Sequence, residues 1–280
     1  MKIIVAKNSG FCFGVRRAID LAKNFSKNIG NIYTIGPIIH NPQVVDKLEK
    51  SGIKVIKRLS DVKNGHIVIR AHGIPKKVLN DIKKKGMKVL DATCPYVTRS
   101  KKYIEELAKE GYKVVIIGNP NHPEIKYIAS YAPKDKVILI SLGDIKRKIK
   151  FSKKIGIITQ TTQSPENFIN IVSKLLSYSN EFKIFNTICP DAINRQNEAV
   201  NLSKKSDVMI IIGGKNSANT KRLTAISKKI QPKTYHIETS GEIKDKWLKG
   251  AKITGIVAGA STPDWIITDV VDRIKGQKTN

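Results

Sequence analysis

The chain has 280 residues, of which 40% are apolar and 6% aromatic, and its 51 basic and 23 acidic residues give a net charge of +28. This length and apolar content fit one to three domains with real cores, and no apolar run approaches the ~20 residues that cross a bilayer. An odd number of cysteines excludes a simple disulfide framework, and residues 1–7 are too short for a signal peptide, so we expect a soluble cytoplasmic protein with reduced thiols.

The first third of the chain alternates short apolar strands with amphipathic helices. Cys12 follows the first strand and precedes a segment with helical apolar spacing, so it lies near a helix N-terminus, where the helix dipole favours a thiolate. His40 and His72 occupy polar loops that follow later strands and open further helices. The predicted strands are 2–6, 32–35, 53–56, 66–70 and the segment before Cys94, with helices after Cys12, from about residue 42 and after Pro75.

The second and third parts of the chain repeat this order of elements. In the second part His122 and Thr161 occupy the corresponding loops, and a short strand leads to Cys189, which Pro190 follows directly. In the third part the loops carry serines, and a last helix follows. The predicted strands are 113–117, 136–140, 155–159, the segment before Cys189, 208–212, 234–237 and 252–258, and the predicted helices include 124–130, 194–203 and 264–274.

Each cysteine is followed, 28 positions later, by a histidine or a serine in a polar loop. The three pairs are Cys12 with His40, Cys94 with His122, and Cys189 with Ser217. Such a repeat predicts three similar α/β domains, each with a mostly parallel sheet flanked by helices. We place them at residues 13–93, 94–188 and 189–280 plus 1–12, because the third part lacks the final strand that residues 2–6 can supply.

The loops lie where parallel sheets collect ligands. Alternating strands and helices imply parallel sheets, and ligands bind at the carboxyl ends of such strands. Every cysteine, and a second set of loops at His72, Thr161 and Ser261, lies at such an end. We therefore expect a pseudo-threefold trefoil in which the three cysteines converge on one centre.

Three converging cysteines favour a metal centre over three buried structural thiols. An iron–sulfur cluster and a zinc ion both accept thiolates, and zinc would need a fourth ligand such as His40 or His122. A cubane cluster with three cysteine ligands leaves one iron open, and that iron can bind a substrate oxygen. The residues alone leave these two metals as alternatives.

The loops supply groups for an anion and a proton. His40, His72 and His122, the hydroxyl and amide groups of the third part and the N–H groups of the turns all suit a phosphate. Glu124 is a candidate general acid, and Thr161 can relay a proton. The residues expected to be structural are His66 and His236 on strands, with Arg195 and Gln196 orienting the helix after Cys189.

These motifs together resemble the LytB family of 4-hydroxy-3-methylbut-2-enyl diphosphate reductases, over essentially the whole chain. The motifs are Cys12, His40, His72, Cys94, His122-Pro-Glu124, Thr161-Thr162, Cys189 and Lys215-Asn-Ser-Ala-Asn219. The resemblance implies the trefoil around a [4Fe–4S] cluster with three cysteine ligands and one open iron. It also implies reduction of (E)-4-hydroxy-3-methylbut-2-enyl diphosphate to isopentenyl and dimethylallyl diphosphates, the last step of the non-mevalonate isoprenoid pathway.

The resemblance also implies a role for individual residues. Glu124 would donate the proton, with Thr161 in its hydrogen-bond chain and His122 lining the pocket. The implied substrate ligands are His40, His72, His122, Thr161, Ser217, Asn219 and Ser261. The family often has a second serine where this chain has Ala218, so a contact at that position can be made only by the backbone. Asn41 accompanies His40 without an assigned role.

Partners follow from the charge and from the chemistry. No flavin or nicotinamide fingerprint is present, so the electrons must come from outside, and an acidic ferredoxin or flavodoxin suits the basic surface. Only nine of the basic residues are arginine and they are scattered, which favours solvated faces over nucleic-acid binding. We expect a monomer without a nucleic-acid or membrane partner. The alternatives are a non-redox dehydratase or zinc enzyme, and a nucleic-acid-binding protein with steeply salt-dependent affinity.

Overall fold

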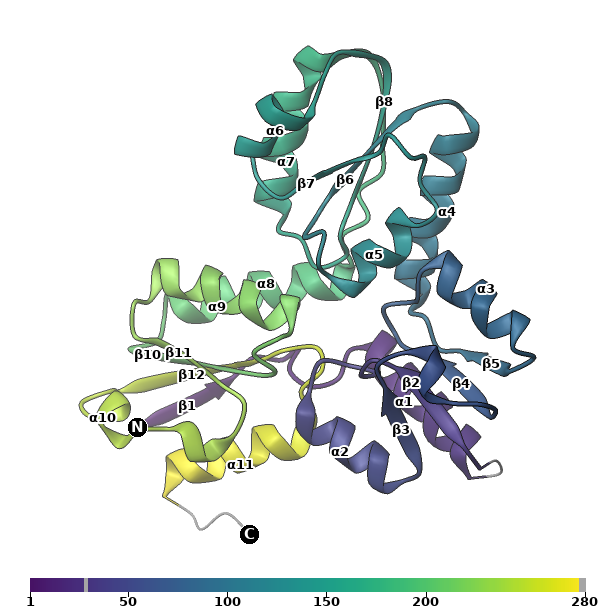
Figure 1. Cartoon of the computed structure of the whole chain (residues 1–280). Helices are drawn as coiled ribbons and strands as arrows, with labels where there is room; N and C mark the ends of the chain where they lie inside the picture. The colour runs from purple at the N-terminus through teal and green to yellow at the C-terminus, as the bar shows by residue number, and fades with distance from the viewer. Residues whose placement is uncertain (28–29, 277–280) are drawn as a thin grey trace. The chain divides into compact units, whose positions relative to one another are not determined.

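The computed structural model describes residues 1–27 and 30–276, and Figure 1 traces their helices and strands. Within these residues the strands form three four-stranded sheets, and every strand pairing is parallel. The chain divides into two compact units. The first unit comprises Met1–Val15, His40–Val44 and Pro190–Asn280, and the second comprises Arg16–Ile39 and Val45–Cys189.

The sheet of the first unit has the order β1-β12-β10-β11. Strand β1 pairs with β12, so the start of the chain completes a sheet built from its last third, as predicted for residues 1–12. Alternate residues of β10 face opposite layers: Ile210 packs with α11, and Ile211 packs with α8 and α9. The elements are β1 (Lys2–Val5), α8 (Pro190–Ser203), β10 (Val208–Ile212), α9 (Ala218–Ile230), β11 (Thr234–Ile237), the 3-10 turn η3 (Ser240–Glu242), α10 (Asp245–Leu248), β12 (Ile253–Ala258) and α11 (Asp264–Lys275).

The first sheet of the second unit has the order β3-β2-β4-β5. Its buried face joins Ile67 and Ile69 of β4 to Ile82 of α3, because those strand positions alternate and the helix turns an apolar stripe toward the sheet. The elements are α1 (Phe13–Ser26), β2 (Ile32–Ile35), α2 (Pro42–Lys50), β3 (Ile53–Ile56), the 3-10 turn η1 (Leu59–Asp61), β4 (His66–Ile69), α3 (Lys76–Lys84) and β5 (Lys88–Asp91).

The second sheet of this unit has the order β7-β6-β8-β9. Its core joins Val114 and Ile116 of β6 to α4 and α5 through Ile104 and Ile125, all of them fully buried. The elements are α4 (Pro95–Lys109), β6 (Lys113–Ile117), α5 (Pro123–Ala129), β7 (Val137–Leu139), α6 (Gly143–Lys148), β8 (Ser152–Thr159), α7 (Pro165–Leu175), the 3-10 turn η2 (Leu176–Tyr178) and β9 (Ser179–Ile184).

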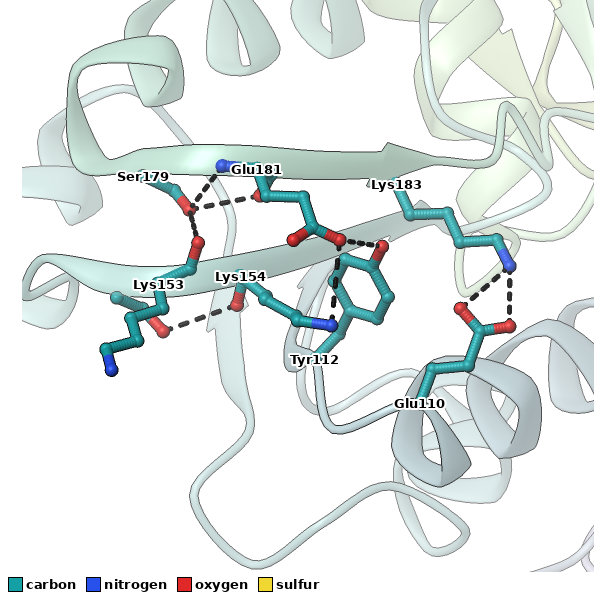
Figure 2. A network of polar contacts seen from close by, with 8 residues as sticks. Glu110, Tyr112, Lys153, Lys154, Ser179, Glu181 and Lys183 are labelled. Atoms are coloured by element: carbon teal, nitrogen blue, oxygen red, sulfur yellow. Dashed lines mark hydrogen bonds and ion pairs between the residues drawn. The ribbon is translucent and has the colours of Figure 1, made fainter.

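Strand β9 is an edge strand whose exposed side chains are tied to its neighbours. Figure 2 shows Glu181 accepting from the Tyr112 hydroxyl while Lys183 pairs with Glu110, the C-cap residue of α4, with 2.7 Å between the charged atoms. The Nζ of Lys183 also lies 2.6 Å from Glu106, and these two carboxylates raise the pKa of Lys183. Charged pairs of this kind blunt an open sheet edge and disfavour pairing with another chain.

The three sheets share one topology. In both sheets of the second unit, the first strand in chain order lies between the second and the third, and the fourth lies outside the third. In the first unit, β10, β11 and β12 take the places of the first three strands. In the sheet of the first unit, β1 takes the place of that fourth strand. The predicted class of three similar α/β sheets flanked by helices is confirmed, whereas the domain boundaries stay a prediction. No helix in the described part of the chain has the length and apolar character needed to cross a membrane.

Candidate active site

All three cysteines occupy the same position in their sheets. Each follows the fourth strand, and its main-chain N–H donates to a carbonyl in the turn after the third strand. The bonds are Cys12 to Ala260 at 3.0 Å, Cys94 to Ala71 at 3.0 Å and Cys189 to Thr161 at 2.9 Å. The thiols are reduced and half-buried, and a helix follows each one. The sequence repeat therefore reflects a repeated backbone geometry.

The sulfur of Cys12 contacts the main chain at the start of α1. The N–H of Val15, in the first turn of α1, donates to Sγ at 3.4 Å. Burial raises the pKa of the Cys12 thiol, and this amide bond opposes that shift by favouring the thiolate. Arg195 lies nearby on α8 and binds both Asp191 at 2.7 Å and the carbonyl of Ala258 at 3.1 Å, which fixes the start of α8 to the end of β12.

The three turns that follow the third strands contain the same main-chain hydrogen bond. In each, the N–H of the fourth residue donates to the carbonyl of the first. The bonds are Gly73 to Arg70 at 2.9 Å, Gln163 to Gln160 at 3.0 Å and Thr262 to Gly259 at 2.9 Å. This register corrects the sequence interpretation by one residue: Thr162, not Thr161, matches His72 and Ser261, and Thr161 matches the alanine before each of them.

The loops after the first strands end in helix N-caps. His122 caps α5 through Nδ1, which accepts from the N–H of Glu124 at 3.3 Å, and Ser217 caps α9 by accepting from Thr220 at 3.2 Å. In the first part of the chain the cap is Asn41, whose Oδ1 accepts from Val44 at 3.1 Å. Asn41, not His40, is therefore equivalent to His122 and Ser217. Counting equal distances from the cysteines selects His40 because the loop after β2 is one residue longer than the other two loops.

Glu124 and Thr161 form a buried, doubly hydrogen-bonded pair among the predicted residues. The N–H of Thr161 donates to Oε1 at 2.7 Å, and its hydroxyl donates to Oε2 at 2.7 Å. Glu124 is 1% exposed, and its burial raises the pKa to about 7 against the lowering effect of both bonds. A carboxyl group that titrates near neutral pH can both hold and release a proton under physiological conditions.

Two histidines of the second unit lie beside this pair. The rings of His72 and His122 meet edge to face, with centroids 5.4 Å apart and planes at 82°. His122 is buried and His72 is half-buried. Because His122 also caps the helix that carries Glu124, the structure brings together four of the predicted residues: His72, His122, Glu124 and Thr161.

The first unit holds further predicted residues. The Ser261 hydroxyl donates to the carbonyl of His40 at 3.2 Å, and a Cβ at Gly214 would lie 2.2 Å from that same oxygen, so only glycine fits there. Asn219 is 6% exposed, and its Nδ2 has no hydrogen-bond partner among the described residues. A buried amide of this kind is suited to a ligand oxygen. Ala218 is the first residue of α9 and is half-buried.

The histidines expected to be structural lie on strands, as the sequence predicts. His66 begins β4, and His236 lies in β11 with its Nε2 2.7 Å from the carbonyl oxygen of Gly213. Sequence reasoning missed Gln160, which is 4% exposed and joins two loops. Its Oε1 accepts from Asn119 at 3.1 Å, and its Nε2 donates to Thr162 at 3.0 Å. The sequence offers one signal for Gln160: it is a polar residue that directly follows a predicted strand.

Comparison with known proteins finds relatives that are similar over nearly the whole chain. The family described as LytB protein matches residues 3–275. The 4-hydroxy-3-methylbut-2-enyl diphosphate reductase of Geotalea uraniireducens is 45% identical over 275 residues, covering 98% of this chain and 97% of that protein. The same-named protein of Syntrophotalea carbinolica is 46% identical over 274 residues, covering 98% of both chains.

Two solved structures are also similar. One is of (E)-4-hydroxy-3-methyl-but-2-enyl diphosphate reductase, the terminal enzyme of the non-mevalonate pathway, with a TM-score of 0.71, 45% identity and coverage of 99% of this chain and 100% of that one. The other is of the E-1-hydroxy-2-methyl-but-2-enyl-4-diphosphate reductase from Plasmodium falciparum, with a TM-score of 0.92, 31% identity and coverage of 97% and 87%. The chain therefore belongs to the LytB protein family.

Proposed function

We propose that the chain reduces (E)-4-hydroxy-3-methylbut-2-enyl diphosphate to isopentenyl and dimethylallyl diphosphates, the last step of the non-mevalonate isoprenoid pathway. Family membership and the names of relatives that span the whole chain support this reaction. One observation carries it at the level of the site. Glu124, with a pKa of about 7, is bound by Thr161, whose carbonyl accepts from the N–H of Cys189. One turn thus connects a proton donor to a cysteine.

The cofactor that we propose is a [4Fe–4S] cluster held by Cys12, Cys94 and Cys189. The three thiols fit such a group because each is reduced, half-buried and placed at the same position of its sheet. They would hold three irons and leave the fourth open. When bound, the cluster supplies electrons and a Lewis-acidic iron for the hydroxyl group of the substrate.

The side chains then have two tasks. In the balanced reaction the allylic C–O bond breaks, two electrons and two protons are consumed, and the oxygen leaves as water. We propose that Glu124 delivers a proton, while Thr161 holds both oxygens of its carboxyl group and His122 fixes the start of its helix. A neutral Glu124 is the form that can donate, and burial favours that form.

The diphosphate needs several hydrogen-bond donors. The resemblance to the family supports a set of ligands that we propose here: His40, His72, His122, Thr161, Ser217, Asn219 and Ser261. The unpartnered Nδ2 of Asn219 supports its place in this set. Any contact at Ala218 would come from its main-chain N–H, which belongs to the first turn of α9 and favours an anion.

Electron delivery requires a second protein. With a net charge of +28, the chain favours an acidic donor, and a ferredoxin or a flavodoxin has the required chemistry. We further propose that the enzyme acts as a monomer in the cytoplasm.

Anaerobic purification followed by iron, sulfide and zinc analysis tests the cofactor and the reaction together. We expect four irons and four sulfides per chain, with a Mössbauer signal of one iron that changes when the substrate is added. A chemically reduced sample should then release both products. Zinc in place of iron, or a loaded cluster that leaves the substrate intact under reducing conditions, would contradict the proposal.

A further inference from the structure

The turn that carries His72 begins with an arginine that has no carboxylate partner among the residues that the structure describes. Arg70 is half-buried, and its Nε donates to the carbonyl of Gly73 at 3.4 Å. No ion pair of the described residues involves Arg70, and burial is the cause that lowers the pKa of its guanidinium. Asp91 of β5 lies opposite Ile69, the residue before Arg70. Its carboxylate accepts a hydrogen bond from the N–H of Thr93 at 2.9 Å.

The position of the guanidinium is defined by the strand beside it. Gly36 follows β2 and begins the loop that leads to His40. A Cβ at Gly36 would lie 2.8 Å from Nη1 of Arg70, so glycine leaves the space that the guanidinium fills. Arg70 therefore lies between the carboxyl ends of β2 and β4, the edge at which parallel sheets bind ligands.

The other two sheets show that this position does not require a charge. Arg70, Gln160 and Gly259 each begin the same turn. Gln160 joins its turn to the loop after the first strand of its own sheet, through Asn119, with a neutral amide. Gly259 has no side chain at all. Since an amide can bridge the two loops, bridging alone does not explain a half-buried cation at residue 70, whose desolvation costs free energy.

A multiply charged anion explains it. The predicted ligands of the second unit, His72, His122 and Thr161, are donors that carry no fixed charge, whereas a guanidinium remains cationic and suits phosphate oxygens. We propose that Arg70 supplies the fixed positive charge that draws and holds the diphosphate of the substrate at the edge of β2 and β4. Arg70 takes this role only if the chain binds a diphosphate, as proposed above.

The test uses the anaerobic, cluster-loaded full chain and inorganic pyrophosphate as the probe. Arg70→Gln copies the residue that the second sheet of its unit carries at this turn, so we expect it to fold. It should raise the Kd for pyrophosphate at least tenfold, as measured by calorimetry, and raise KM for the substrate with kcat changed less than threefold. Arg70→Lys keeps the charge and should recover most of the affinity.

A matched variant separates local charge from total charge. Arg58 belongs to the same sheet region but is 81% exposed and pairs with Asp61 at 3.5 Å, so Arg58→Gln should change the pyrophosphate Kd less than twofold. Equal weakening by Arg70→Gln and Arg70→Lys would overturn the proposal, because the charge would then be irrelevant. Unchanged binding by Arg70→Gln, or no pyrophosphate binding by the wild type, would overturn it as well.

This experiment also distinguishes the two proposals from each other. Pyrophosphate binding needs no turnover, so a chain without reductase activity can still show the effect of Arg70. Conversely, normal reductase turnover with unaltered pyrophosphate binding in Arg70→Gln would leave the proposed function intact and remove Arg70 from it.

Discussion

Thr161 binds both oxygens of the Glu124 carboxyl group, from its N–H at 2.7 Å and from its hydroxyl at 2.7 Å. The carbonyl of Thr161 at the same time accepts from the N–H of Cys189 at 2.9 Å. One residue therefore sets the positions of the candidate acid and of a cysteine. Since hydrogen bonds to a carboxylate favour its charged form and burial favours its neutral form, the pKa of about 7 reflects a balance in which burial is larger.

Replacing Glu124 with glutamine should abolish turnover while preserving the fold. The amide keeps the volume of the side chain but cannot donate an acidic proton, so we expect kcat to fall at least 100-fold. In the wild type, activity should decline as the pH rises through about 7, because the proton donor is lost. The measurements are kcat against pH and the absorption spectrum of the bound cluster, which should be unchanged in Glu124→Gln. Normal turnover by this variant would exclude Glu124 as the acid.

The same group makes folding stability depend on pH. Its pKa in the folded chain is about 7 and its ordinary value is 4.5, so the folded state holds the proton more tightly. The resulting stabilisation is fully present below pH 4.5 and is lost as the pH rises through about 7, by about 3 kcal/mol in all. Chemical denaturation at several pH values should show this decline in the wild type and a flatter profile in Glu124→Gln. Equal slopes in the two proteins would contradict it.

Replacing Thr161 with valine tests the hydroxyl separately from the backbone. Valine keeps the N–H bond to Oε1 but removes the donor to Oε2, so the charged form of Glu124 is less favoured and its pKa should rise further. We expect kcat to fall about tenfold and the alkaline limb of the pH profile to shift upward. Thr161→Ser restores the hydroxyl and should recover both values. A serine variant as impaired as the valine variant would mean that packing, not the hydrogen bond, matters.

Periodic features of the sequence predicted the fold well, and side-chain geometry required the structure. The alternation of strands and helices, the cysteine repeat and the missing fourth strand were enough to predict three parallel sheets and the pairing of β1 with β12. The one-residue offset at His40 was missed because counting from a cysteine assumes loops of equal length. The offset at Thr161 was missed because the hydrogen bond that defines the register of each turn is visible only in the structure. Gln160 was not predicted because it bridges two loops that lie about 40 positions apart in the sequence, and their proximity is visible only in the structure.

Removing residues 1–7 should destabilise the first unit, because β1 is the outer strand beside β12. Ile3 and Ile4 pack against opposite layers of that sheet, so the truncation exposes both faces of β12 at its edge. We expect the melting temperature of the unloaded chain to drop by at least ~10 °C. The single variants Ile3→Ala and Ile4→Ala keep the strand and should each cost about 1–3 kcal/mol. A truncated chain that melts like the full one would refute this role for β1.

Gly73 should tolerate no side chain, for two separable reasons. Its φ of +74° lies in the left-handed region, and a Cβ there would lie 2.6 Å from the ring of Tyr127, which is 7% exposed. Gly111 has a φ of +77° with nothing within 4 Å of a Cβ, so Gly111→Ala carries only the backbone cost of about 1–2 kcal/mol. Gly73→Ala should cost at least about 2 kcal/mol more, measured by denaturant unfolding, because the buried ring must move.

The double variant Gly73→Ala with Tyr127→Ala completes this test. Alanine at residue 127 removes the ring atoms that the new Cβ would meet, so the double variant should be more stable than the sum of the two single changes predicts. Because Gly73 directly follows His72, Gly73→Ala should also displace that imidazole and raise KM, whereas Gly111→Ala should leave KM unchanged. Equal costs for the two glycine variants, with no coupling to Tyr127, would show that the ring yields freely and that the turn does not depend on this contact.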